Sequence, residues 1–346
     1  MRLGLVHGSS GAEFAVDMET VLEAERLGYS SIWTSESWGS DAITPAAWIL
    51  ARTTRIKVGT GIIQMGARVP SMAAMTAMTL QAMSGNRFIL GIGPSGPQVI
   101  EGWYGVPYGK PLTRTREYVD IVRKVLRREA PLTHEGFHYQ IPRTGEGTTG
   151  LGKALKSILH GDPSLPIYTA AITPAGLRTA AEIADGVIPI YMNPEKFDVF
   201  GKWLDEGFAK AGGGKGLKDF DVAPYVNVAM GDDLEECRNP IRAQLALYIG
   251  GMGARDKNFY NDLAKRLGYE EAAVKIQDLY LDGKRAEAAA EVPDALIDDI
   301  ALIGSPDRIR ERLSVWKAAG AEGKVGTLIV RKASVDALRL IAEEVL

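Results

Sequence analysis

Short, almost continuously apolar segments alternate with helical segments along most of this 346-residue chain. Segments that are apolar throughout are buried on both faces, which is typical of a parallel sheet covered by helices. The alternation predicts an α/β fold, and eight strand–helix units favour a (β/α)₈ TIM barrel with insertions. An open sheet of six or seven strands is the alternative. The eight predicted strands are residues 3–6, 31–34, 56–62, 88–93, 167–171, 186–191, 222–230 and 325–330.

Two segments interrupt this alternation. Residues 131–163 contain a predicted hairpin with its turn at Glu135-Gly136, followed by a glycine-rich stretch that we interpret as a surface loop. The second segment is residues 233–300, of which residues 233–290 are mostly helical. We interpret both as insertions in a single domain that spans residues 1–346, and we expect them to shape a substrate pocket.

Glycine and the spacing of apolar residues predict a turn and a helix near the N-terminus. The pattern predicts a turn at residues 7–11 and a helix over residues 13–27, which Gly28 ends.

The composition limits the possible partners and the compartment. A net charge of −3 gives no overall positive field for nucleic acid or for an anionic membrane. The single cysteine, Cys237, excludes an intrachain disulfide framework. Because the sequence has no signal-peptide pattern and no apolar run long enough to span a membrane, we expect a cytoplasmic protein that acts on a small molecule.

Glycines end two consecutive predicted strands. Gly59-Thr60-Gly61 is followed by two isoleucines, and residues 91–97 read GIGPSGP. Glycine at a strand end lets the backbone approach a flat ligand closely, and this end of a TIM-barrel strand faces the active site. We therefore expect a ligand site lined by these glycines, with a plain structural turn as the alternative.

Residues 91–96 also match the G-x-G-x-x-G pattern of dinucleotide-binding sites. That motif needs a helix that opens at the glycines and an acidic residue about 20 positions later. Pro94 and Pro97 interrupt the stretch, and the later acidic residue is missing. We therefore favour a ligand-lining loop over a Rossmann site.

His134-Glu135-Gly136-Phe137-His138 matches the HExxH pattern of zinc proteases. That site needs both histidines on one face of a helix. Gly136 and the flanking β-type residues favour a hairpin, so we predict no metal site there.

Other candidate site residues follow two further strands. Glu36, Ser37 and Trp38 come after the second strand, where Trp38 could stack on a planar ligand and Glu36 could move a proton. The alternative is a capping glutamate beside a surface tryptophan. Thr173 sits at a predicted helix start, where free backbone N–H groups could bind an anion or where it could serve as an ordinary N-cap.

Methionines recur near helical spacing in the predicted helix over residues 70–83. We favour core packing or a subunit interface over a soft wall for a cofactor. The methionines in the helix are Met72, Met75, Met78 and Met83, and Met65 precedes it.

Several stretches resemble the bacterial luciferase-like family, and more narrowly its actinobacterial branch that uses the deazaflavin coenzyme F420. The resemblance covers nearly the whole chain, and residues 95–118 are its most specific part. The stretches that carry it are Gly59–Ile62, Phe88–Gly93, Ser95–Trp103, Lys110–Tyr118, Ile167–Pro174, Ala181–Ile188 and Gly304–Leu313.

The resemblance implies a TIM barrel, often dimeric, with the coenzyme ring in the barrel mouth against the third strand. In that family a non-proline cis peptide forms a bulge there, and it would fall at Gly61-Ile62. Two loops would hold the ribityl chain and the phosphate. The residues that the resemblance assigns to the cofactor are Gly61, Ile62, Ile63, Gly93, Pro94, Ser95, Gly96, Pro97, Gln98, Ala170, Ala171, Ile172, Thr173 and Ile190, with Tyr191 beside them.

The chain departs from the family at one place. Deazaflavin-dependent dehydrogenases of this family carry Asp-His after the second strand, whereas this chain has Glu36-Ser37. Serine is a poor general base unless it is activated. We therefore expect an oxidoreductase that reduces a C=C or C=O group with hydride from F420, with Glu36 or a water supplying the proton. The alternatives are a monooxygenase that uses flavin mononucleotide (FMN) and a non-catalytic flavin-binding protein.

Overall fold

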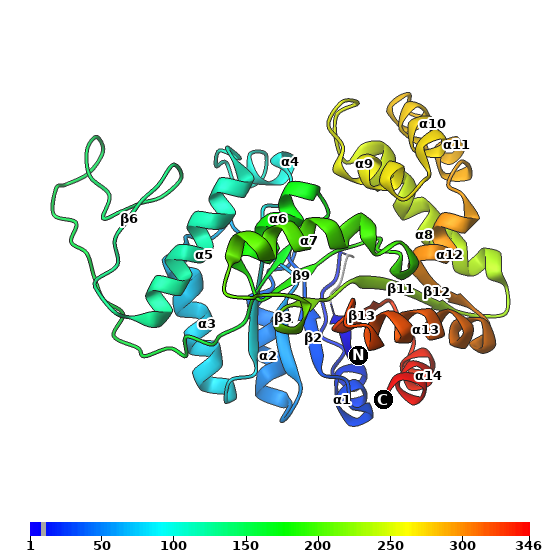
Figure 1. Cartoon of the computed structure of the whole chain (residues 1–346), viewed down its shortest axis with the longest axis horizontal. Helices are drawn as coiled ribbons and strands as arrows, with labels where there is room; N and C mark the ends of the chain where they lie inside the picture. Colours follow the sequence, from blue (N-terminus) through cyan, green and yellow to red (C-terminus); the bar gives the residue numbers. More distant parts are fainter. Residues whose placement is uncertain (8–11) are drawn as a thin grey trace.

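The computed structural model describes residues 1–7 and 12–346 (Figure 1). Its centre is a ring of parallel strands that helices surround. Within the described residues the ring has eight positions, as the alternation predicted. In order around the ring they are β1 (Arg2–His7), β2 (Ser31–Thr34), β3 (Lys57–Thr60), β5 (Phe88–Gly93), β8 (Ile167–Ala170), β9 (Gly186–Ile188), β10 (Asp221–Val222) together with β11 (Tyr225–Met230), and β13 (Thr327–Arg331).

The segment of β10 and β11 closes this ring because it pairs on both sides. Asp221 lies opposite Gly186 of β9, and Tyr225 lies opposite Ile329 of β13. The Tyr225 amide also donates to the Pro189 carbonyl at 3.0 Å. β13 in turn pairs with β1. The predicted TIM barrel is therefore confirmed.

Two strand predictions need correction, and one strand was not predicted. The strand predicted over residues 222–230 is two strands, because Pro224 has no amide hydrogen to donate to a neighbour. The strand predicted to end at Ile62 ends at Thr60, and the short β4 (Ile63–Gln64) resumes after the bend. The sequence reading missed β12 (Ala301–Gly304), a four-residue strand that pairs with β11 outside the ring.

Helices follow most strands of the ring, as predicted. They are α1 (Met18–Leu27), α2 (Ile43–Arg52), α3 (Pro70–Ser84), the one-turn α4 (Pro97–Ile100), α5 (Pro111–Arg127), α6 (Pro174–Ile183), α7 (Asp198–Ala211), α13 (Pro306–Ala321) and α14 (Val335–Val345).

The prediction that α1 begins at residue 13 was wrong. The Asp17 carboxylate accepts a hydrogen bond from the Thr20 amide at 3.0 Å, so Asp17 caps a helix that begins at Met18. Gly28, in the left-handed conformation, ends it as expected. Of the turn predicted at residues 7–11, only His7 belongs to the described residues.

The two insertions lie where the sequence placed them. The first forms the hairpin of β6 (His134–Glu135) and β7 (Gln140–Ile141), then an extended loop that projects from the body of the molecule (green, left of Figure 1). The second stands beyond the ends of β11 and β12 (yellow and orange in Figure 1). Its helices are α8 (Leu234–Ala246), α9 (Phe259–Arg266), α10 (Glu270–Leu281), α11 (Arg285–Ala290) and α12 (Asp294–Ile300).

The hairpin histidines do not face each other on a helix. The Glu117 carboxylate accepts hydrogen bonds from the backbone amides of residues 137, 138 and 139 at 2.8–3.0 Å and so anchors the hairpin to α5. His134 contacts Asp120, whereas His138 contacts the Lys110 backbone.

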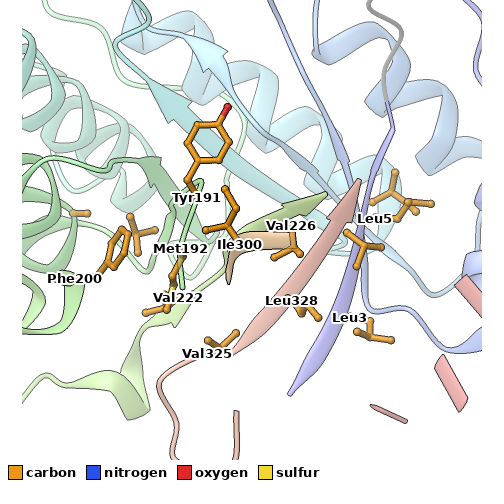
Figure 2. Close-up of a cluster of buried hydrophobic side chains, with 14 of the residues drawn as sticks. Leu3, Leu5, Tyr191, Met192, Phe200, Val222, Val226, Ile300, Val325 and Leu328 are labelled. Carbon is orange, nitrogen blue, oxygen red and sulfur yellow. The ribbon is translucent and has the colours of Figure 1, made fainter. Parts of the chain in front are cut away.

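Side chains alternate between two apolar layers along the barrel strands. Leu3, Val226 and Leu328 belong to the layer between the sheet and the helices (Figure 2). A second, smaller cluster fills the barrel interior. It consists of Trp33, Ile89, Tyr168, Ile188, Ala223 and Ile329. The interior is thus packed with side chains in the manner of a TIM barrel.

Gly59 makes room for the indole of Trp33 inside the barrel. A Cβ atom at position 59 would lie 2.6 Å from the Trp33 ring. We expect Gly59→Ala to lower the free energy of unfolding by about 1–3 kcal/mol, as overpacking of a core does. Gly39→Ala is the matched control, because a Cβ atom at position 39 would meet no described neighbour within 4 Å. Equal unfolding midpoints in urea for the two variants would contradict this packing.

No helix among the described residues is long and apolar enough to cross a membrane. The expected cytoplasmic location stays a prediction.

Candidate functional site

The carboxyl ends of the barrel strands carry a backbone bulge at Gly61-Ile62. The peptide bond between these residues is cis, which confirms the expectation from the family resemblance. Three neighbouring strands hold the bulge. The Gly61 amide donates to the Thr34 carbonyl of β2 at 2.6 Å, and the Tyr225 hydroxyl of β11 donates to the Gly61 carbonyl at 3.1 Å. The Thr60 hydroxyl donates to the Gly91 carbonyl of β5 at 2.8 Å.

Beside the bulge lies a wall with few side chains. Ile62 is half-buried and packs on the interior cluster. A Cβ atom at Gly93 would lie 2.7 Å from the Ile62 side chain and 3.5 Å from Ala170. Ile62, Gly93 and Ala170 therefore meet at the mouth. Ile190 forms a backbone bridge with Tyr225 and packs on the larger apolar layer. Glycine leaves this wall flat enough for a planar ring.

Ile63 does not belong to this wall. It is fully buried in the layer between sheet and helices. Its side chain therefore lies in the same layer on which Ala171, Ile172 and Ile190 pack.

The loop after β5 turns back over the mouth. Ser95 adopts a left-handed conformation with φ of 58°, and its carbonyl accepts a hydrogen bond from the Tyr108 hydroxyl at 3.0 Å. Gly96 precedes α4, and Pro97 and Gln98 form the exposed first turn of that helix. Pro94, Ser95 and Gly96 are half-buried, so this loop can contact a ligand along its length.

The loop from Ala170 to Thr173 leads into α6. The Thr173 hydroxyl accepts a hydrogen bond from the Gly176 amide at 3.0 Å, so Thr173 is an N-cap. Arg266 of α9 donates to the Ile172 carbonyl at 2.7 Å, and its Nε is buried with no partner among the described residues. A helix N-terminus beside an arginine is a favourable place for an anion.

Glu36 connects two loops of the mouth. Its side chain is 2 % exposed and forms an ion pair of 2.6 Å with Arg68. The same carboxylate accepts hydrogen bonds from the backbone amides of Gln64 at 3.0 Å and Ala42 at 3.2 Å. All three partners are donors, so Glu36 acts here as an acceptor that ties the loop after β2 to the loop after β4.

Ser37 and Trp38 follow Glu36 at the rim of the mouth. Ser37 is exposed, and the Trp38 side chain is 59 % exposed. A pocket of about 260 Å³ opens beside them. Burial, with a smaller contribution from the charge of Glu36, raises the pKa of the Tyr104 hydroxyl in this pocket. The lining residues are Glu36, Ser37, Gly39, Ser40, Asp41, Ala67, Arg68, Trp103 and Tyr104.

Four residues of the mouth were missing from the sequence-based prediction: Arg68, Tyr225, Arg266 and Arg331. Arg331 offered a usable signal, because a charged residue at the end of an apolar barrel strand faces the active-site end. Arg68 and Arg266 lie in a loop and an insertion, and only the three-dimensional structure brings them to the mouth.

Comparison with known proteins decides the family. Residues 3–323 match the model of the family described as luciferase-like monooxygenase. The chain belongs to this luciferase-like family. A Mycobacterium tuberculosis relative, provisionally named a coenzyme F420-dependent oxidoreductase, is 45% identical over 99% of this chain and 98% of its own length.

More distant relatives of this luciferase-like chain include a 5,10-methylenetetrahydromethanopterin reductase from Archaeoglobus fulgidus. It is 28% identical over 97% of this chain and 98% of its own length. The solved structure of the F420-dependent tetrahydromethanopterin reductase from Methanopyrus kandleri superposes with a TM-score of 0.76 at 23% identity. That superposition covers 99% of this chain and 98% of the reductase chain, and it supports the barrel fold.

Proposed function

We propose that this luciferase-like protein is an oxidoreductase that transfers a hydride between coenzyme F420 and a small organic substrate. The observation that carries this proposal is the 45% identity, over almost the full length of both chains, to the M. tuberculosis protein named for F420. The flat wall at the Gly61-Ile62 bulge supports it independently.

The residues of the mouth fit such a coenzyme. Ile62, Gly93 and Ala170 offer an apolar wall to a planar ring, and a side chain at position 93 would fill that space. The unpartnered Nε of Arg266, beside the N-terminus of α6, offers positive charge for the phosphate. Of the cofactor residues that the resemblance assigned, we keep in this proposal Gly61, Ile62, Gly93, Pro94, Ser95, Gly96, Pro97, Gln98, Ala170, Ala171, Ile172, Thr173 and Ile190.

When bound, a deazaflavin supplies obligate two-electron hydride chemistry, and the protein contributes position and electrostatics. Ile62 fixes the ring plane and keeps water from one face. Tyr225 holds the Gly61 carbonyl, so that the wall keeps its shape. Arg68 and Glu36 hold the two loops that border the substrate side.

Glu36 and its neighbour Ser37 have different roles in the delivery of the proton. Because its oxygens already accept from three donors, we propose that Glu36 is a positioning residue and that a water beside Ser37 supplies the proton. Trp38 and Ser37 then border the substrate from the rim. This arrangement favours reduction of a C=C or C=O group, because no histidine base stands at position 37.

Anaerobic turnover tests the proposed function. Reduced F420 should be reoxidised by the enzyme in the presence of an activated alkene or ketone, followed by the return of deazaflavin absorbance. Turnover that depends on oxygen and reduced FMN would replace this function with that of a monooxygenase, the activity in the family description. Tight coenzyme binding without turnover of any acceptor would leave a non-catalytic binding protein.

We also propose that the protein is a homodimer. Apolar side chains that are 51–74 % exposed line one face of α3 and the residue before it, namely Val69, Met72, Met75 and Met83. The projecting loop carries Leu151, Leu155 and Ile158, which are 76–95 % exposed. Exposed apolar groups of this extent mark association surfaces, and a second copy of the chain would cover both.

Charge on both surfaces should separate the subunits. We expect the double variant Met75→Glu/Ile158→Glu to elute with the mass of one chain in size-exclusion chromatography with light scattering, and the wild type with twice that mass. Thr149→Glu adds a charge to an exposed polar position of the same loop and should leave the mass unchanged. A wild type with the mass of one chain would contradict the proposal.

A further inference from the structure

Arg331 ends β13 and faces the inside of the barrel at its mouth. Side chains alternate along this strand, and Ile329, two residues earlier, belongs to the interior cluster. Arg331 therefore lies on the same face, one layer nearer the mouth. Across the ladder it is paired with Asn227 of β11.

The Arg331 guanidinium has no ion pair and no hydrogen bond within the described part of the chain, and its Nε is buried. The Oδ1 atom of Asn227 is buried and unpartnered as well. Unpaired polar atoms inside a protein cost free energy, so such groups are usually paired.

Charged and titratable neighbours do not neutralise Arg331. Burial raises the pKa of both Tyr191 and Tyr225, and the nearby Arg331 charge opposes this only in part, so both phenols are neutral near pH 7. The adjacent Lys332 is a second cation, whose pKa burial and Arg331 together lower. None of the groups that act on these three residues is a carboxylate.

Two other arginines of the barrel and its mouth are paired with carboxylates. At the opposite end of the barrel, Arg2 pairs with Asp221 at 2.8 Å. At the mouth, Arg68 pairs with Glu36. Arg266 donates to the Ile172 carbonyl and keeps an unpartnered Nε, which the proposed function assigns to the coenzyme phosphate. Arg331 is thus a cation of the mouth that the described residues leave available for an anion from outside.

The position of Arg331 relates it to the coenzyme wall. Tyr225 lies opposite Ile329, two residues before Arg331 on the same face, and it donates its hydroxyl hydrogen to the Gly61 carbonyl of the bulge. A carboxylate bound at Arg331 would therefore place the rest of a small molecule next to the wall formed by Ile62.

We propose that Arg331, assisted by the Nδ2 donor of Asn227, binds the carboxylate of the substrate, which makes the substrate a small carboxylic acid with a reducible C=C or C=O group. The assignment of a substrate rests on the proposed function. A planar guanidinium can bind a carboxylate through two parallel hydrogen bonds, which also orients it. The coenzyme carries acidic groups of its own, so the experiment separates these two sources of carboxylate.

Calorimetric titrations with crotonate and with its neutral analogue crotonamide test the assignment. The wild type loaded with F420 should bind crotonate at least tenfold more tightly than crotonamide. Arg331→Leu should abolish that difference, and Arg331→Lys should restore part of it. Arg143→Leu, which removes the same charge from an exposed loop, should keep the wild-type preference. The affinity for F420 itself should change less than twofold in Arg331→Leu.

Two results would overturn the assignment. A large loss of F420 affinity in Arg331→Leu would mean that the guanidinium binds the acidic part of the coenzyme and not the substrate. Equal binding of crotonate and crotonamide by the wild type would remove the carboxylate preference. The same titrations are repeated without coenzyme, which keeps this test separate from the proposed function. If the wild type fails to bind F420, the proposed function is refuted, but the preference for crotonate can still be measured.

Discussion

Ile62→Asp will abolish measurable binding of coenzyme F420, with an expected loss of affinity on the order of 100-fold or more. Ile62 packs on the interior cluster and, in our proposal, forms the wall beneath the coenzyme ring. A carboxylate there would lose its hydration against an aromatic ring and has no cationic partner in the wall. Binding is followed by quenching of tryptophan fluorescence as F420 is added.

The control is Ile62→Leu, which keeps the volume and the apolar character and should bind F420 within about threefold of the wild type. Circular dichroism and the unfolding midpoint establish that the aspartate variant is folded. Because Ile62 is half-buried at the mouth, we expect the aspartate variant to stay folded. A folded Ile62→Asp variant with wild-type affinity would refute the placement of the ring.

Glu36→Gln is the second substitution for which we expect a large effect. It replaces an acceptor of three hydrogen bonds by an amide and breaks the ion pair with Arg68. Loss of one partner of a buried pair typically costs about 3–5 kcal/mol, and the residual contact of Arg68 with Asp41 places the expected loss near the lower value. Thermal unfolding should therefore shift down by roughly 5 °C or more.

The same substitution should lower kcat/KM for reduction by about 10- to 100-fold, because the loops around the pocket lose their connection. Asp41→Asn is the matched control. It removes the weaker contact of Arg68, at 3.6 Å, and asparagine still accepts hydrogen bonds as a helix cap. We expect the control to change stability by less than about 1 kcal/mol. Equal effects of the two substitutions would contradict the role assigned to Glu36.

The strand–helix order of the barrel could be predicted from sequence because burial on both faces leaves a plain apolar signal. The segments at residues 31–34 and 88–93 match β2 and β5 without correction. Local signals also located Gly28 and Thr173 as helix boundaries. The start of α1 was misplaced because Phe14 and Val16 continue the apolar spacing of the helix, whereas the Asp17 cap decides where it begins.

Short elements and pairs of residues far apart in the chain could not be predicted from the sequence. The four residues of β12 follow a helix directly and have no turn signal before them. The resemblance located the bulge at Gly61-Ile62, but it did not reveal that Ile63 turns into the outer core. The pairing of Glu36 with Arg68 joins residues 32 positions apart, and the isolation of Arg331 depends on strands far away in sequence.

A parallel titration of the purified apo-protein with F420 and with FMN, followed by tryptophan fluorescence, tests whether F420 is the coenzyme of this protein. We predict micromolar binding of F420 and at least tenfold weaker binding of FMN. Tight binding of FMN with no response to F420 would contradict this coenzyme assignment and would make oxygen uptake with reduced flavin the activity to measure.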